Sequence, residues 1–471
     1  MPTGFLMGSS PPLCPGCVER DQEIVRLKAR ITDLGSEVLR LRQEIEDLRR
    51  DNNRQAARFR RRKLKKRRKK PGRKNGHAAD VRPTPTPDQV DRIVDVPCAE
   101  CPDCHAPLLD PGLVVQFQTD LPPIVPLVTQ FNIETGYCSC CRRFCQGRHP
   151  EQTSDAIGAA GNTLGPVILT MAAELKHRLG VPYRRICDFF ATYYDLHVCP
   201  ATFVRAEQRL ADRARPTYQL LLDALRQAHV VHADETGWRI GRVNAWLWVF
   251  SSKDTTIYVI RTSRGSDVPL EMLGDDFDGY LVVDGLKSYD VLTVAKGRCN
   301  AHLLRRCKEL TDSVPPKEQA YVQRLSKLLQ RAIALAQRRE QYTADAYARR
   351  VQHLEDRLDD WLDRLPRSAG ADLDRLANHV AAHRGEWFTF LHDPEVPPTN
   401  NHAEHMLRPA VITRKIGGCN KTLLGAVVHG ILSSLMVTCK RQGKRFLDLA
   451  KHLWSSSDPP ALPLAALPSP S

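Results

Sequence analysis

The sequence predicts an α/β chain of several domains, with a sheet-containing core near its centre and helical regions on both sides. Three observations support this prediction. Apolar runs of strand length alternate with turn residues between positions 229 and 283. Helical patterns of apolar residues fill the segments before and after these runs. A length of 471 residues exceeds what one hydrophobic core usually organises and predicts roughly two to four domains.

The core is predicted from four strands and one helix. The strands span residues 229–233, 245–250, 256–260 and 280–283, and a short helix spans residues 268–273. The turn-like sequence Ser-Ser-Lys-Asp separates the second strand from the third. The order strand, strand, strand, helix, strand is that of a ribonuclease-H-like nucleotidyltransferase core.

Acidic residues mark two of these strands and one later helix. Asp234 closes the first strand, Asp284 closes the fourth, and Glu404 begins a helical pattern after a Pro-rich break. Three converging carboxylates suit a pair of Mg²⁺ or Mn²⁺ ions about 4 Å apart, an arrangement that serves phosphoryl transfer. One strand-end acid alone is more often a turn residue or a cap, but the three in this order favour a metal site.

Four sequence blocks resemble the signature blocks of bacterial transposases of the insertion sequence 66 family. They are HADETGW at 232–238, VDGLKSY at 283–289, CNAH at 299–302 and NNHAEHMLRP at 400–409. The resemblance extends from about residue 22 to residue 453. It implies that Asp234, Asp284 and Glu404 are the Asp-Asp-Glu metal ligands of a polynucleotidyl transferase. The implied partners are transposon terminal inverted repeats, target DNA and accessory proteins.

Other residues near these blocks are candidates for auxiliary roles. His302 lies in the third block, although a lone histidine is more often a structural hydrogen-bonding residue. Arg408 shares a helix face with Glu404 and is suited to a phosphate. Arg414 and Lys415 follow as candidate DNA contacts.

The charge distribution also indicates a polyanionic partner. Lys and Arg number 69 against 54 Asp and Glu, for a net charge of +15, and basic residues fill 13 of the 17 positions from 58 to 74. Phosphate contacts from such a run make DNA binding strongly salt-dependent. A solvated linker is the alternative. The candidate contacts are Arg60, Arg61, Arg62, Lys63, Lys65, Lys66, Arg67, Arg68, Lys69 and Lys70.

The N-terminal segment, residues 20–53, has the pattern of a coiled coil. Apolar residues alternate at spacings of three and four over four heptads: Ile24, Leu27, Ile31, Leu34, Val38, Leu41, Ile45 and Leu48. β-Branched residues at one core position and Leu at the other favour a parallel two-stranded coil. This predicts a homodimer or a higher oligomer, and an amphipathic helix lying on its own domain is the alternative.

Cysteine spacing predicts a structural zinc site. Fifteen cysteines without a recognisable secretory signal indicate reduced thiols and metal ligands. Two Cys-x-x-Cys pairs suit tetrahedral Zn²⁺, namely Cys101 with Cys104 and Cys138 with Cys141. The surplus Cys98, Cys140 and Cys145 leave the choice of ligands open.

The domain boundaries follow from these features. A coiled coil (20–53) precedes a basic, Pro-rich linker (54–92), a zinc-binding module (93–150) and a helical domain (151–226). The core (227–309) continues after a helical insertion (310–392), with C-terminal helices (393–455) and a disordered tail (456–471). In the helical domain, helices at 183–194 and 201–210 are compatible with a helix-turn-helix that directs Arg205 to DNA. Any antiparallel helical pair has a similar pattern.

The sequence thus predicts a DNA transposase that cleaves transposon ends and transfers strands into target DNA. We expect no apolar stretch that approaches the ~20 residues of a membrane-spanning helix, and we therefore expect a cytoplasmic, nucleoid-associated protein without a membrane partner. A catalytically inactive DNA-binding regulator and a structure-selective nuclease with the same fold are the alternatives.

Overall fold

The computed structural model describes residues 22–31, 33–34, 37–38, 40–41, 82–98, 100–107, 112–122, 124–365 and 370–455. The basic run from Arg60 to Lys70, the last predicted heptad with Ile45 and Leu48, and the tail at 456–471 lie outside these residues. Residues 22–31 are helical, and the described apolar positions of the heptads are exposed in the single chain. Their exposure is compatible with an apolar helix face that a second chain would cover. The coiled-coil dimer stays a prediction.

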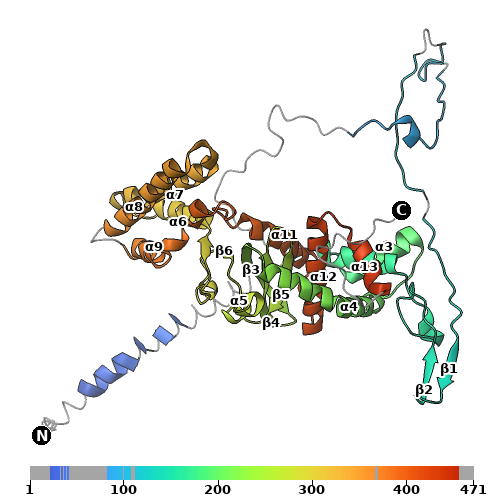
Figure 1. Ribbon diagram of the computed structural model, residues 1–471, viewed down its shortest axis with the longest axis horizontal. Coiled ribbons are helices and arrows are strands. Elements are labelled where there is room, and N and C mark those ends of the chain that lie inside the picture. The colour runs from blue at the N-terminus through green and yellow to red at the C-terminus, as the bar shows by residue number, and fades with distance from the viewer. Residues whose placement is uncertain are drawn as a thin grey trace, which may run out of the picture.

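A five-stranded mixed sheet forms the centre of the molecule (Figure 1). Its strands are β3 (Val230–Ile240), β4 (Val243–Ser251), β5 (Thr256–Arg261), β6 (Tyr280–Val283) and β7 (Lys296–Arg298). Their order in the sheet is β5-β4-β3-β6-β7. The pairs β3–β4 and β4–β5 are antiparallel, whereas β3–β6 and β6–β7 are parallel. The strands predicted at 245–250, 256–260 and 280–283 are confirmed, and β7 was not predicted.

The first strand differs from the prediction, because β3 does not end at Asp234. It continues to Ile240, since its hairpin with β4 pairs every residue from His232 opposite Ser251 to Ile240 opposite Val243. The parallel pairing of β3 with β6 covers only residues 230–232. Asp234 therefore lies inside a strand. It comes two residues after His232, the last residue of β3 that pairs with β6. Asp284 does follow directly after β6.

Two helices cover the sheet. Helix α11 (Asn401–Ile416) packs against β3 and β4, with Leu407 and Ala410 buried against Trp238 and Leu247. Helix α12 (Leu423–Arg441) packs on β5 and on the long helix α4 (Pro200–Arg226). The short α5 (Asp267–Leu273) connects β5 to β6, close to the predicted position.

Helix α12 also protects the free edge of the sheet. Strand β5 is an edge strand, and its exposed backbone groups would otherwise invite pairing with another chain. Ser434 Oγ accepts the N–H of Tyr258 (2.8 Å), and Thr438 Oγ1 accepts the N–H of Thr256 (3.1 Å). Gly430 completes this face, since a Cβ there would lie 3.0 Å from the carbonyl oxygen of Tyr258. Small and hydroxylated residues at spacings of four thus dock the helix onto strand backbone.

The expectation that no stretch approaches membrane-spanning length was wrong for α12. By length and composition it is the one helix among the described residues that could cross a membrane. Of its most apolar 18-residue window, 67% is buried inside the protein, because it packs between β5 and α4. A helix at the centre of a hydrophobic core needs the same length and apolar composition as a membrane-spanning helix.

The helical region before the sheet contains α2 (Pro166–Ala173), a π-helical turn (Glu174–Arg178), α3 (Tyr183–Tyr194) and α4. The helix predicted at 183–194 is confirmed. The helix predicted at 201–210 is much longer, because α4 continues through Pro216 to Arg226. Its buried stripe persists through Thr217, Leu221 and Leu225, so tertiary packing extends the helix beyond its first apolar run.

Helices between β7 and α11 form a lobe with its own hydrophobic core, at the left of Figure 1. They are α6 (Asn300–Thr311), α7 (Pro316–Gln337), α8 (Ala344–Asp363), α9 (Ala371–Ala382) and α10 (Thr389–His392). Tyr321 and Trp361 stack at 4.4 Å between ring centroids and exchange hydrogen bonds with each other's backbone carbonyls. These contacts fix α7 against α8, and the core of the lobe also includes Val282 of β6.

Replacing Thr438 with Val should destabilise the protein by about 1–3 kcal/mol, the usual cost of a buried backbone N–H left without a partner. The two side chains have similar shapes, so the change removes the hydrogen bonds to Thr256 while keeping the packing. Chemical denaturation followed by tryptophan fluorescence measures the loss. Thr163→Val at an exposed position is the control. Equal midpoints for the two variants would show that α12 does not depend on this contact.

Candidate active site

Asp234 lies within β3, Asp284 follows directly after the neighbouring strand β6, and the charge of Asp284 acts on Asp234. Burial raises the pKa of Asp234 to about 8, and the negative charges of Glu235 and Asp284 add to the increase. Each carboxylate also accepts a local backbone N–H, from Glu235 at 2.8 Å and from Leu286 at 2.9 Å. Asp234 is therefore held in a desolvated place within electrostatic reach of Asp284, where like charges disfavour ionisation of Asp234.

Glu404 reaches this region from the first turn of α11. Asn400, the residue before the helix, is buried and joins it to β3: its Nδ2 donates to the carbonyl of Ala233 (2.7 Å). Because that amide nitrogen is committed, Asn400 Oδ1 accepts from Nδ1 of His232 (3.1 Å). Burial lowers the pKa of His232 to about 4, so the ring is neutral and can donate through Nδ1. The helix start is thereby fixed beside the strand that carries Asp234.

His302 connects the three acids. Its Nε2 lies 3.6 Å from Oε1 of Glu404. The neighbouring Cys299 raises the pKa of His302, and the negative charge of Asp284 raises it further. The histidine also acts electrostatically on Asp234, where its positive charge favours the ionised carboxylate. His302 is therefore placed to compensate part of the negative charge that gathers here.

Cys299 links the same group to the backbone. Its sulfur accepts the N–H of Asn400 at 3.1 Å. Burial alone would raise the pKa of Cys299, but the hydrogen bonds from His302 and Asn400 outweigh it and lower the pKa overall. The block at 299–302 and the block at 400–409 thus meet in space.

Glu235, on the opposite face of β3 from Asp234, was missed by the sequence analysis. Its side chain is 2% exposed and pairs with Nη2 of Arg264 at 2.8 Å. The hydroxyl of Tyr289 donates to its other oxygen (3.3 Å). Burial, followed by repulsion from Asp284, raises its pKa. A second acid directly after Asp234, within the HADETGW block, was the signal that could have identified it.

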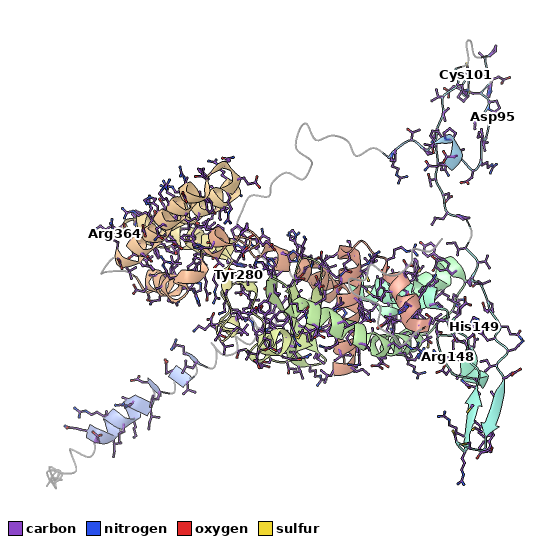
Figure 2. All side chains as sticks on the ribbon, in the orientation of Figure 1. Asp95, Cys101, Arg148, His149, Tyr280 and Arg364 are labelled. Carbon is purple, nitrogen blue, oxygen red and sulfur yellow. The ribbon has the colours of Figure 1, made fainter. Side chains whose placement is uncertain are left out.

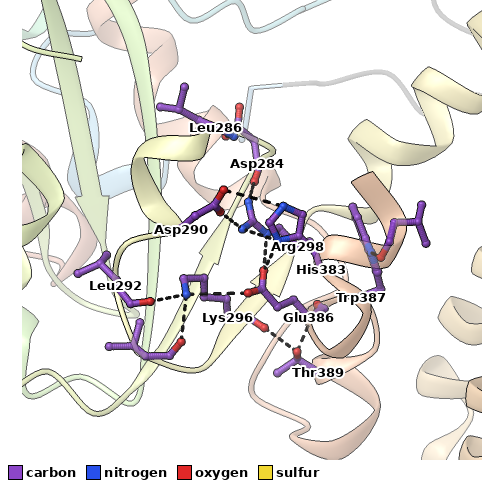
Figure 3. A network of polar contacts seen from close by, with 12 residues as sticks. Asp284, Leu286, Asp290, Leu292, Lys296, Arg298, His383, Glu386, Trp387 and Thr389 are labelled. Atoms are coloured by element: carbon purple, nitrogen blue, oxygen red, sulfur yellow. Dashed lines mark hydrogen bonds and ion pairs between the residues drawn. The ribbon is translucent and has the colours of Figure 1, made fainter. Parts of the chain in front are cut away.

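A second network supports the Asp284 loop from below (Figure 3). Arg298 on β7 is almost fully buried and donates to the backbone carbonyl of Asp284 (2.9 Å) and to Glu386 (2.5 Å). It also pairs with Asp290, and Lys296 of the same strand lies 3.9 Å from Glu386. This network joins the helical lobe to the strand end that carries Asp284.

The acids have the chemistry of a cation site, although no cluster of three or more His, Cys, Asp or Glu side chains has metal-binding geometry among the described residues. The donors present are carboxylate oxygens, which Mg²⁺ and Mn²⁺ prefer. Their mutual repulsion, expressed in the raised pKa of Asp234, is what a divalent cation would relieve. The chemistry of these donors therefore suits such an ion.

The two cysteine pairs adopt the same local conformation. In each, backbone N–H groups hydrogen-bond the first sulfur and lower its pKa, at Cys101 from Cys104 and at Cys138 from Cys141. The residue after each second cysteine has a positive φ, 59° at His105 and 52° at Arg142. The structure does not bring the pairs together: Cys101 (Figure 2) lies far from the hairpin of β1 (Thr135–Cys138) and β2 (Arg143–Gln146).

Of the described residues predicted to contact DNA, three are exposed and one is hydrogen-bonded to the sheet. Arg205 on α4 and Arg408 and Lys415 on α11 are exposed. Arg414 instead donates to Thr236 Oγ1 (3.1 Å) and to the carbonyl of Gly237, and burial lowers its pKa. Its guanidinium is thus used to hold α11 against β3.

Comparison with protein families decides the classification. The family described as Transposase IS66 family matches residues 161–428, which is more than half of the chain. The chain belongs to the IS66 transposase family. The matched region contains Asp234, Asp284 and Glu404 and the whole of the helical lobe, and it ends within α12. A search of curated proteins gives no match.

In this transposase, Asp234→Asn should raise the thermal midpoint of the metal-free protein at pH 8 but change it little at pH 4–5. The pKa of Asp234 is raised to about 8, so the folded state retains a proton that the unfolded chain loses near pH 4. Its contribution to stability therefore falls as the pH rises from about 4 to 8. Thermal unfolding in EDTA measures this, with Asp275→Asn at an exposed site as the control. An equal shift at both pH values would contradict the assignment.

Proposed function

We propose that the protein is a metal-dependent DNA transposase. It hydrolyses a phosphodiester at each transposon end, and the released 3′ hydroxyl then displaces the 3′ oxygen of a target phosphodiester. The observation that carries this proposal is that His302, 3.6 Å from Glu404, also interacts electrostatically with Asp234 and Asp284. Membership of the IS66 family supports the same chemistry.

The sheet supports a ribonuclease-H-like core. Three antiparallel strands are followed by a helix and two strands that are parallel to the first, in the order β5-β4-β3-β6-β7. Strand β6 pairs with β3 only at residues 230–232. Asp234, inside β3, and Asp284, after β6, both follow soon after this paired segment, which supports a shared role for the two acids.

Each residue of the site has a proposed role. Asp234, Asp284 and Glu404 would hold Mg²⁺ or Mn²⁺, and two such ions would supply activation of the attacking oxygen and stabilisation of the leaving one. His302 orients the Glu404 carboxylate and balances its charge. Arg408, one turn after Glu404 on the same exposed face, is placed to bind a phosphate of the DNA.

Glu404→Gln should reduce cleavage and strand joining by about 100-fold or more, because the amide keeps the size of the side chain but removes the charge that a cation needs. Binding to transposon-end DNA should change little. Gel assays on labelled end DNA with Mg²⁺ measure both, and Glu395→Gln at an exposed position nearby is the control.

The same assay distinguishes the alternatives. A structure-selective nuclease would cleave but never join strands, and a regulatory relative would bind without cleaving. Wild-type transposition by Glu404→Gln would show that the three-carboxylate mechanism is wrong.

The proposal includes one structural Zn²⁺ held by Cys101, Cys104, Cys138 and Cys141. Both loops already direct backbone N–H groups at their first sulfur, the local geometry that stabilises thiolates for a metal. Zinc binding would then supply the free energy that brings the two pairs together.

Zinc content should be near one per chain and should be lost in the double variant Cys104→Ser/Cys141→Ser, since a single ion needs ligands from both pairs. Metal analysis of the purified full-length protein measures this. Cys98→Ser/Cys145→Ser is the matched control and should retain its zinc. Loss of zinc in that control alone would move the site to the surplus cysteines.

A further inference from the structure

Two segments of the chain that lack acidic residues meet beside the candidate active site. Residues 236–253 contain no Asp or Glu, and neither do residues 405–447. The first segment includes most of the β3–β4 hairpin, and the second includes all of α11 beyond Glu404 together with α12. In a chain with 54 acidic residues, two such segments in contact create a surface of one sign of charge.

The hairpin tip is fixed to the loop between α11 and α12. Asn420 forms a β-bridge with Ile240, its carbonyl accepts the N–H of Gly241 (2.8 Å), and its Oδ1 accepts from Trp238 Nε1 (2.9 Å). Gly241 has a φ of +59°, and a Cβ there would lie 3.1 Å from the carbonyl oxygen of Lys421. The tip and the loop therefore form one rigid surface.

This surface starts at the active site and leads away from it. Strand β3 carries Asp234 and ends at Ile240, whereas α11 carries Glu404 and ends at Ile416, four residues before Asn420, which pairs with Ile240. The strand covers about 20 Å over that distance at ~3.3 Å per residue. The helix covers about 18 Å at 1.5 Å per residue, which agrees. At ~3.4 Å per base pair, this is about six base pairs of duplex DNA.

Basic side chains lie along the whole path. Arg408 and Lys415 project from the same face of α11 as Glu404, and both are exposed. Arg242 at the hairpin tip and Lys421 in the adjoining loop are also exposed. Apolar side chains stand between them: Ile412, Ile416, Val243 and Leu423 are 50%, 45%, 56% and 64% exposed. Exposed apolar residues between cations are typical of proteins that contact a DNA groove.

We infer that Arg408, Lys415, Lys421 and Arg242 form a track for duplex DNA, in which Arg242 and Lys421 bind backbone phosphates about six base pairs from the scissile one. This inference rests on the proposed function and adds to it a DNA path and two residues outside the catalytic group. A protein partner with an acidic surface would also suit the charge. The line from Glu404 to the tip, the spacing and the absence of acids favour DNA.

The track explains a structural feature that catalysis alone does not require. Arg414 is half-buried and ties the second half of α11 to Thr236 and Gly237 of β3. Without this contact the helix could diverge from the sheet after Leu407, and Lys415 would no longer lie on the line from Glu404 to Arg242. The positioning of Arg414 thus keeps the exposed cations in register.

The first test is the salt dependence of binding by the full-length protein to a duplex carrying the element's own terminal sequence. Each phosphate contact contributes about 0.9 to the slope of log affinity against log salt. Arg242→Ala/Lys421→Ala should therefore lower the slope by about 2 and weaken binding roughly tenfold. Lys253→Ala/Lys440→Ala removes the same charge from the opposite ends of β4 and α12 and is the matched control. An equal fall in both variants, or in neither, would overturn the track.

The second test locates the DNA directly. A photo-crosslinking residue in place of Val243, introduced into the Glu404→Gln protein, should join the duplex about six base pairs from the cleavage position. Crosslinking to protein, to distant DNA or to nothing overturns the inference. The proposed function is judged separately, since it fails only when Glu404→Gln cleaves like wild type. A misplaced crosslink from an inactive Glu404→Gln protein would overturn the track alone.

Discussion

The geometry of the candidate site depends on one buried side chain, Asn400. Its amide donates to β3, its carbonyl oxygen accepts from His232, and its backbone N–H donates to the sulfur of Cys299. These three bonds fix the elements that carry Asp234, His302 and Glu404 relative to one another. A buried amide with every group paired allows few alternative arrangements, because any movement would leave a polar atom without a partner.

The acids that Asn400 helps to position are held at an electrostatic cost. Burial and like charges raise the pKa values of Asp234 and Glu235, and at Asp234 the pKa reaches about 8, so the metal-free site favours a protonated Asp234 near neutral pH. Positive charge opposes this increase in pKa. It comes from Arg264 beside Glu235, from His302 beside Glu404 and from the cation that we propose. Strongly shifted acids of this kind are common at functional sites, where strain in the resting state is relieved by the bound ligand.

Patterns over a few neighbouring residues were enough to predict several strands and helices. The strands at 245–250 and 256–260 and the helix at 183–194 followed from apolar runs and turn residues, and the structure contains them. The family was identified from four short blocks and is confirmed. The extension of β3 beyond Asp234 could not be predicted, because it results from pairing with β4.

Features that depend on distant partners were missed for the same reason. Strand β7 consists of Lys296, Gly297 and Arg298, which have no apolar pattern, and it exists because β6 lies beside it. The burial of Arg298 requires Glu386 and Asp290, and the burial of Glu235 requires Arg264. None of these pairs is close enough in the sequence to produce a local signal. The sequence therefore led us to predict Asp234, Asp284 and Glu404 as the site acids, but it gave no indication of these ion pairs.

A long helical insertion separates Asp284 from Glu404 in the sequence. The chain must therefore be brought back to the sheet after the insertion. Asn300, fully buried, donates from its backbone to the carbonyl of Pro398 (3.0 Å) and from its side chain to Trp387 and Pro398. The helical lobe thus begins and ends at one residue. The entropic cost of closing a loop grows only slowly with its length, and the lobe's own core stabilises the chain within it. Asn300 and Asn400 fix the two ends of the insertion. The position of Glu404 beside β3 therefore depends mainly on these two residues and little on the length of the insertion.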